Sequence, residues 1–200
     1  MEARNVSAGA EKPGRGGLLM PLRRLLRDRR GVGAVEFAIV APLMIMTYIG
    51  AFEISVAVTM SRKVSRASST VSDLLTRNET INAATLASMA DVTKNVVAPF
   101  SQNGYTLKIT GIAVDTTGKA TVAWSYGGGG NAAYAKGATV TNLPKEMDAT
   151  KTFVVRTEYT VPHKILLMAP GLSSSVTTLP LSRTSYFRQR SGEGITCGDC

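Results

Sequence analysis

The sequence predicts an α+β protein, built from a long N-terminal helix that spans a membrane and continues beyond it, a second amphipathic helix, and a small antiparallel sheet. Three observations predict this fold class. A basic segment precedes about 20 apolar residues, apolar residues then recur at helical spacing, and after residue 104 they alternate as in strands. We therefore expect a basic leader at 1–31, an anchor helix at 32–58, a helical region at 59–103 and a β-rich domain at 104–200.

The anchor is defined by the distribution of charge. Residues 1–31 carry eight Lys and Arg against three acidic residues, whereas the only charged residues between Gly31 and Ser61 are Glu36 and Glu53. At a rise of about 1.5 Å per residue, about 20 helical residues cross a hydrocarbon core of about 30 Å, and residues 32 to about 51 supply them. A cleaved signal peptide is the rival interpretation, but its apolar region is only about 7–15 residues long.

The basic flank also predicts the topology. Five arginines at positions 23, 24, 27, 29 and 30 precede the anchor, and three cations at positions 62, 63 and 66 follow it. The denser N-terminal flank favours a cytoplasmic N-terminus. Because most of the excess positive charge lies beside the anchor, it is a topology signal and not a nucleic-acid footprint, so we expect no nucleic-acid partner.

Helical spacing continues past the anchor. Apolar residues on one face are Val64, Ala67, Val71, Leu74 and Leu75, and Arg77-Asn78-Glu79-Thr80 predicts a break. A second amphipathic helix is predicted from Leu86, Met89, Val92, Val96 and Phe100. It should end near Ala98-Pro99, because the residue before a proline is disfavoured in a helix.

The period then changes from helix to strand. Alternating residues are Tyr105, Leu107 and Ile109 in one run and Ala120, Val122, Trp124 and Tyr126 in the next. Asp115-Thr116-Thr117-Gly118 between them predicts the turn of a hairpin. Further strands are expected at 153–161 and about 182–188, and 127–130 is expected to be a flexible four-glycine loop. Trp124 and Tyr159 are interpreted as core or sheet-face residues.

Residues for catalysis are sparse, so we expect no enzyme, no cofactor and no metal site. The single histidine, His163, follows Pro162 without a nucleophile motif, and the sequence contains no HExxH, GxSxG, Walker or GxGxxG pattern. A surface or core histidine is the simpler interpretation. Function must then come from assembly or binding.

Cys197 and Cys200 end the chain as Cys-Gly-Asp-Cys. A thioredoxin-like motif would need a following helix, and zinc would need two more ligands. In an oxidising compartment outside the cytoplasm, a disulfide between the two is the default, with free or intermolecular thiols as the alternatives.

The N-terminal part of the anchor matches a known pattern. Gly31-Val32-Gly33-Ala34-Val35-Glu36-Phe37 resembles a type IV prepilin-type processing site, with glycine before the cleaved bond and glutamate at the fifth mature position. The string AVEFAIVAPLMIMTYIGAFE is similar to the TadE-like pseudopilins of the tight-adherence (Flp/Tad) pilus system, in which an early Glu-Phe, a proline and a second glutamate recur. Glu36-Phe37, Pro42 and Glu53 match. A leader of 31 residues departs from the short leaders common in the family, and the C-terminal SRTSYFRQRSGEGITC resembles related Tad proteins more weakly.

This resemblance implies cleavage between Gly31 and Val32 by a prepilin peptidase, and pairing of Glu36 with the new amino group of Val32 on a neighbouring subunit. It implies a minor pseudopilin that helps initiate or assemble a Tad pilus for surface attachment. The expected place is the bacterial inner membrane, with the C-terminal domain in the periplasm. Expected partners are the peptidase, other pilins and pseudopilins, and Tad inner-membrane components. The alternative is a bitopic periplasmic binding module with an uncleaved anchor.

Elementary electrostatics bears on the same residues. A carboxylate just inside hydrocarbon must be protonated, reach the interface, or pair with a cation. For Glu36 that cation is either a neighbour's N-terminal ammonium or Arg29 and Arg30 of the same chain, and physics alone does not separate the two. Pro42 should kink the helix by clashing with the carbonyl of Ala38. Glu53 lies near the outer boundary, where a solvated carboxylate is ordinary.

Overall fold

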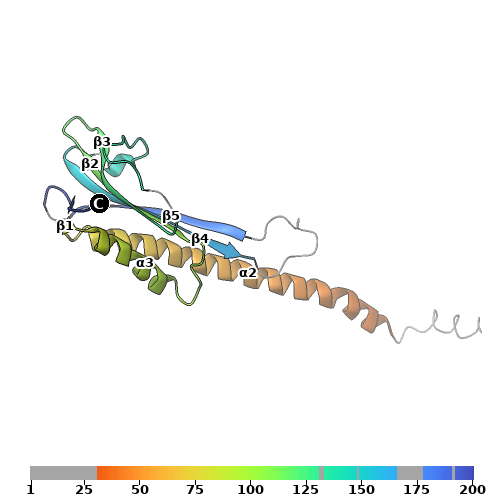
Figure 1. The fold of residues 1–200 in the computed structure, drawn as a ribbon. Helices are drawn as coiled ribbons and strands as arrows, with labels where there is room; N and C mark the ends of the chain where they lie inside the picture. Colours follow the sequence, from red (N-terminus) through yellow and green to blue (C-terminus); the bar gives the residue numbers. More distant parts are fainter. Residues whose placement is uncertain (1–30, 131–132, 148, 166–177, 191) are drawn as a thin grey trace, which may run out of the picture. The chain divides into compact units, whose positions relative to one another are not determined.

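The structure is a computed structural model that describes residues 31–130, 133–147, 149–165, 178–190 and 192–200 (Figure 1). The arginine-rich part of the predicted leader therefore lies outside the described residues. The chain divides into two compact units, residues 1–48 and 49–200. We call the second the folded unit and describe each unit by itself.

Helix α2, Val32–Leu75, crosses the boundary between the units and is 44 residues long. In residues 31–48 nearly every side chain is exposed, as expected for a surface that lipid would cover. The helix continues through Pro42, and the predicted kink there stays a prediction. Its most apolar 18-residue window has a mean hydropathy of 1.9 and none of that window is buried, so by length and composition α2 can cross a membrane.

The folded unit combines the end of α2 with a second helix and a sheet, which confirms the predicted α+β class. Helix α3, Ala83–Val97, follows the two-residue strand β1, Thr80–Ile81. Among the described residues, four strands form one antiparallel sheet in the order β3-β2-β4-β5. Their bounds are β2 Thr106–Val114, β3 Ala120–Gly128, β4 Thr152–Lys164 and β5 Thr178–Arg188, with the 3-10 helix η2, Lys145–Met147, between β3 and β4. Figure 1 shows α2 and α3 lying along the same face of this sheet.

The core lies between the helices and this face of the sheet. Helix α2 contributes side chains spaced three or four residues apart, including the fully buried Val64, Ala67 and Val71, which is the periodicity of one helical face. They pack in one cluster with Leu86 of α3 and with alternate residues of the sheet, among them Tyr159. Trp124 and Tyr159 are both buried, as predicted.

The predicted boundaries are largely confirmed. Helix α2 ends at Leu75, directly before the predicted break. Helix α3 begins after Asn82, whose side chain accepts a hydrogen bond from the backbone N–H of Thr85 at 2.8 Å, and it ends at the extended Ala98 before Pro99. The β2–β3 hairpin turns at Asp115, whose backbone N–H donates to the carbonyl of Lys119 at 3.1 Å.

The expected glycine loop is wrong in its first half. Gly127 and Gly128 belong to β3 and pair with Lys108 and Leu107 of β2. Strand pairing uses backbone groups, so the hairpin register extends through residues without side chains once the preceding pairs are formed. Only Gly129 and Gly130, both with positive φ, leave the strand.

Three strand features go beyond the prediction. Strand β5 begins four residues earlier than expected and includes Pro180, which an edge strand tolerates. Strand β4 extends through Pro162 to Lys164. Residues near the C-terminus form β6, Thr196–Cys197, which pairs in parallel with β1.

Candidate functional site: the anchor helix and its support

Gly31 and Val32, the predicted processing site, lie at the start of α2. Val32 is the first residue of the helix, and both residues are exposed. A Cβ added at Gly31 or at Gly33 would meet no described atom within 4 Å, and neither glycine has a positive φ. The fold of the described residues therefore does not require glycine at position 31.

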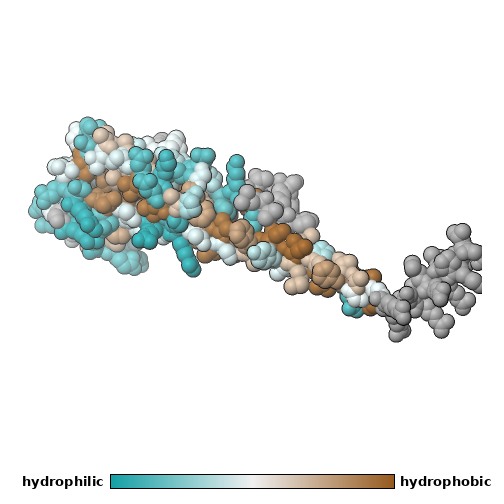
Figure 2. Space-filling model, turned by 90° about the horizontal axis from the view of Figure 1, so that it is seen from below, coloured by the Kyte–Doolittle hydropathy of each residue, from teal (hydrophilic) through white to brown (hydrophobic). Residues whose placement is uncertain are grey.

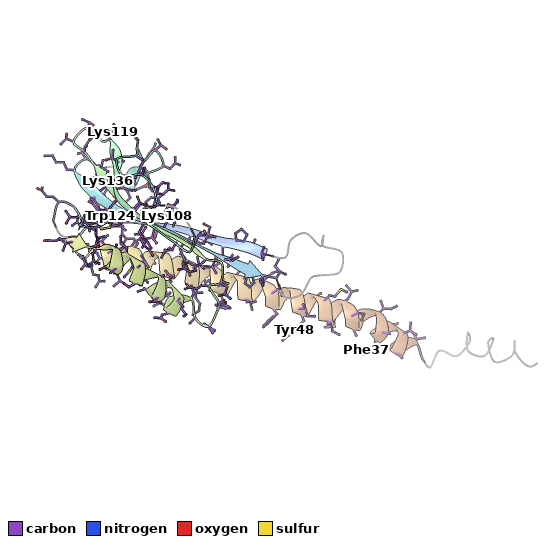
Figure 3. All side chains as sticks on the ribbon, in the orientation of Figure 1. Phe37, Tyr48, Lys108, Lys119, Trp124 and Lys136 are labelled. Atoms are coloured by element: carbon purple, nitrogen blue, oxygen red, sulfur yellow. A yellow bond between two sulfur atoms is a disulfide. The ribbon has the colours of Figure 1, made fainter. Side chains whose placement is uncertain are left out.

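Glu36 and Phe37 lie one turn further along the helix. Both are exposed, and Figure 3 shows the Phe37 side chain projecting from α2. Among the described residues Glu36 makes no hydrogen bond or ion pair, and the intrachain partners considered for it, Arg29 and Arg30, lie outside them. Apart from its helix neighbours Val32 and Phe37, no predicted site residue among those described is brought to Glu36.

The hydroxyls of Thr47 and Ser55 in α2 are satisfied by the helix itself. Thr47 donates its hydroxyl to the carbonyl of Leu43 at 2.9 Å, and Ser55 donates to Ala51 at 2.9 Å. Because each hydroxyl donates to the carbonyl four residues earlier, neither is left unpaired. Glu53, the second acidic residue of the anchor, is half-buried and lies within the folded unit.

The second half of α2 is fixed to the sheet by buried polar contacts as well as by the core. The Ser72 hydroxyl donates to Oγ1 of Thr157 at 2.8 Å and lies 3.1 Å from Oγ of Ser185. These bonds join α2 to the central strand β4 and the edge strand β5. Because buried hydroxyls need such partners, they set the position of α2 along the sheet.

Two cations close to the end of the anchor also tie α2 to the rest of the folded unit. Lys63 donates to the carbonyls of Ala98 at 2.5 Å and Val96 at 3.5 Å, at the C-terminal end of α3. Arg183 of β5 donates to Oγ of Ser61 at 2.7 Å. Lys63 is one of the three cations that follow the anchor and reduce the difference in charge between its two flanks. The contacts with α3 show that it also has a structural role.

The C-terminal segment is held by its backbone and by a disulfide. Cys197 and Cys200 are bonded to each other, which leaves no thiolate for a zinc ion. Asp199 between them accepts a hydrogen bond from the backbone N–H of Ala83, at the first residue of α3, at 2.7 Å. Two residues before Cys197, the carbonyl of Ile195 accepts a hydrogen bond from the Trp124 indole at 2.7 Å. The tail therefore closes the end of the core near the start of α3.

A charged cluster holds the segment that covers the other face of the sheet. Tyr134 has Nζ of Lys108 at 3.9 Å and Cζ of Arg156 at 4.7 Å from its ring centroid, and its hydroxyl donates to Glu158 at 3.4 Å. Burial raises the pKa of Tyr134 above 10.0, and the Glu158 carboxylate adds to the effect. These contacts attach the loop before η2 to β2 and β4. His163, the single histidine, is buried at the end of β4.

Residues 31–73 match the model of a family described as TadE-like protein. The match spans the predicted processing site, Glu36-Phe37, Pro42 and Glu53, so the resemblance noted from the sequence is confirmed over this segment. It associates the chain with the Tad pilus and with the membrane. No match was found among curated proteins or among solved structures.

Proposed function

We propose that this protein is a membrane-anchored minor pseudopilin that helps to initiate or assemble a Tad/Flp pilus. The observation that carries the proposal is the TadE-like match over residues 31–73, which lies within a helix that continues from an exposed apolar part into the core of the folded unit. A noncatalytic role in assembly fits the sparse chemistry of the described residues. On this proposal the leader is cytoplasmic and the folded unit lies in the periplasm.

The proposed mechanism begins with cleavage between Gly31 and Val32 by a prepilin peptidase. Cleavage removes a segment of net charge +5 and creates an ammonium group at Val32. An ammonium and a carboxylate that enter hydrocarbon are each costly alone, and pairing with the opposite charge lowers the cost of both. Glu36 of one subunit and Val32 of its neighbour would then fix the axial register of two packed anchors.

The carboxylate is tested by Glu36→Gln, expressed from the chromosomal copy. The variant should insert normally, since it carries less charge into the membrane, and it should form few or no pili. Glu53→Gln is the matched control at the water boundary and should reduce piliation less. Wild-type pilus numbers in Glu36→Gln cells with equal protein in the membrane fraction would refute the pairing.

Processing is tested by sequencing the N-terminus of protein from peptidase-competent cells. The expected first residue is Val32, and Gly31→Leu should leave the leader attached without affecting insertion. Gly33→Leu is the matched control, because neither glycine has a neighbour within 4 Å of an added Cβ. A native chain that begins at Met1 or Glu2 would contradict the pseudopilin-processing model.

A further inference from the structure

A groove of about 490 Å³ opens at one end of the folded unit. It lies between α2, the connection from α3 to β2, and the paired ends of β4 and β5. Its lining includes Val56, Met60, Phe100, Pro162, His163 and Lys164. Most of this surface is apolar, and Lys164 is an exposed cation.

The α2 residues that line the groove follow closely in the chain after the apolar segment expected to cross the membrane. If about 20 residues from Val32 cross the hydrocarbon, Val56 is about 7.5 Å beyond the last of them by helical rise. The headgroup region on each side of a bilayer is about 5–7 Å thick, so Val56 is at the outer edge of that region and Met60 is one turn beyond it. The exposed apolar surface of α2 continues to these residues, because Ile54 is 67% exposed and Val58 is 43% exposed. Figure 2 shows hydrophobic residues on the surface of this helix.

The charges at this end of the folded unit are mainly positive. On α2 between residues 49 and 72, Glu53 is the only acidic residue, whereas Arg62, Lys63 and Arg66 are cationic. Arg183 pairs with Tyr159, five residues before Lys164 along β4, and is bonded to Ser61. Lys63 is engaged with α3, which leaves Lys164 as the exposed cation in the lining of the groove that can meet a negatively charged group.

We propose that this end of the folded unit binds an anionic phospholipid of the bilayer, with one acyl chain in the groove and the phosphate beside Lys164. The apolar lining fits the acyl chain, the Lys164 ammonium fits the phosphate, and exposed apolar residues of α2 continue to the groove. Such binding would hold the folded unit against the membrane surface. The inference rests on membrane anchoring in the proposed function and not on the role in pilus assembly.

The test uses the full chain in lipid nanodiscs that contain either phosphatidylglycerol or phosphatidylcholine. A photoreactive benzoylphenylalanine replaces Phe100 inside the groove or, as a control, the exposed Tyr134 on the other sheet face. Illumination should attach phosphatidylglycerol to the Phe100 position and not to the Tyr134 position, as read by intact mass. Native fluorescence emission of Trp124 shows that the Phe100 variant is folded. If that emission is lost, benzoylphenylalanine is placed instead at Val56, a second position in the groove.

Charge specificity is tested by Lys164→Gln. This variant should lower the preference for phosphatidylglycerol over phosphatidylcholine by about fivefold. Lys119→Gln and Lys136→Gln remove the same charge from exposed sites (Figure 3) and should leave the preference for phosphatidylglycerol unchanged. The register of β2 with β4 places the β2–β3 turn, which carries Lys119, at the Thr152 end of β4 and so opposite the groove.

Three results would overturn the proposal. Labelling at Phe100 no greater than at Tyr134 would exclude lipid from the groove, as would a cross-link to the chain's own uncharged residues 166–172. Equal labelling by the two lipids would exclude recognition of the anionic headgroup. None of these results depends on pilus formation, so failure of this inference is separable from failure of the proposed function.

Discussion

Gly111→Ala should destabilise the folded unit by displacing the indole of Trp124. A Cβ at Gly111 would lie only 2.6 Å from both Cζ2 and Nε1 of Trp124, and it would also contact Cε2. These atoms belong to a rigid, buried ring, so the ring must move as a whole. The movement would break the 2.7 Å hydrogen bond from the indole to the carbonyl of Ile195.

The expected cost combines two effects. Overpacking a core costs about 1–3 kcal/mol, and a buried donor left without its acceptor costs about 1–3 kcal/mol. We expect a loss of about 3 kcal/mol in the free energy of unfolding, since relaxation of the tail would relieve part of both. For a folded unit of about 150 residues this corresponds to a fall in Tm of about 6–12 °C.

The assay is urea unfolding of the full chain in detergent, followed by fluorescence, because Trp124 is the single tryptophan of the chain. The Gly111→Ala variant should also show red-shifted native emission. Gly198→Ala is the matched control, as an added Cβ there meets no atom within 4 Å, and it should cost less than about 0.5 kcal/mol. In a Trp124→Leu background, which lacks the clashing atoms and whose unfolding is followed by circular dichroism because it contains no tryptophan, Gly111→Ala should cost less than about 1 kcal/mol. A loss below about 1 kcal/mol with unchanged emission in the native background would refute the reasoning.

Three further predictions concern the support of the anchor and the ends of the sheet. Lys63→Met should cost about 1 kcal/mol because it removes the cation from the α3 C-terminus, whereas Arg62→Met on the exposed face should be neutral in the same unfolding assay. The pKa of Asp115 should lie below 3.8, because the Thr117 hydroxyl and the backbone N–H of Lys119 donate to its ionised carboxylate. The hairpin turn is then fully stabilised above a pH of about 4 and weakens as pH falls through the lowered pKa. An NMR titration of Asp115 should detect the lowered pKa, and Thr117→Val should raise it. Cys197 and Cys200 should resist alkylation in exported, non-reduced protein, and two alkylated thiols would contradict the disulfide.

Local signals were sufficient for most of the fold. Charge depletion over residues 32–51 predicted the exposed apolar part of α2, which is long enough to cross a membrane, and helical spacing predicted that the same helix continues to Leu75. The turn at Asp115–Gly118 was predicted because its residue types favour a turn directly. The candidate assembly segment was also read from the sequence, since Gly31, Glu36, Pro42 and Glu53 lie within 23 residues of one another.

Features made by residues far apart in the chain required the tertiary structure. Strands β1 and β6 are two residues long, too short for a period, and each forms only because the fold brings it to the other. The Lys63–Ala98 contact, the Arg183–Ser61 contact and the groove at Val56 have the same origin. The sequence by itself determined the elements that are stabilised by interactions between residues close in the chain, such as a membrane-length apolar helix or a turn. The pairing of distant segments was decided by the tertiary structure, because its energy comes from burial and hydrogen bonds that exist only after the chain has folded.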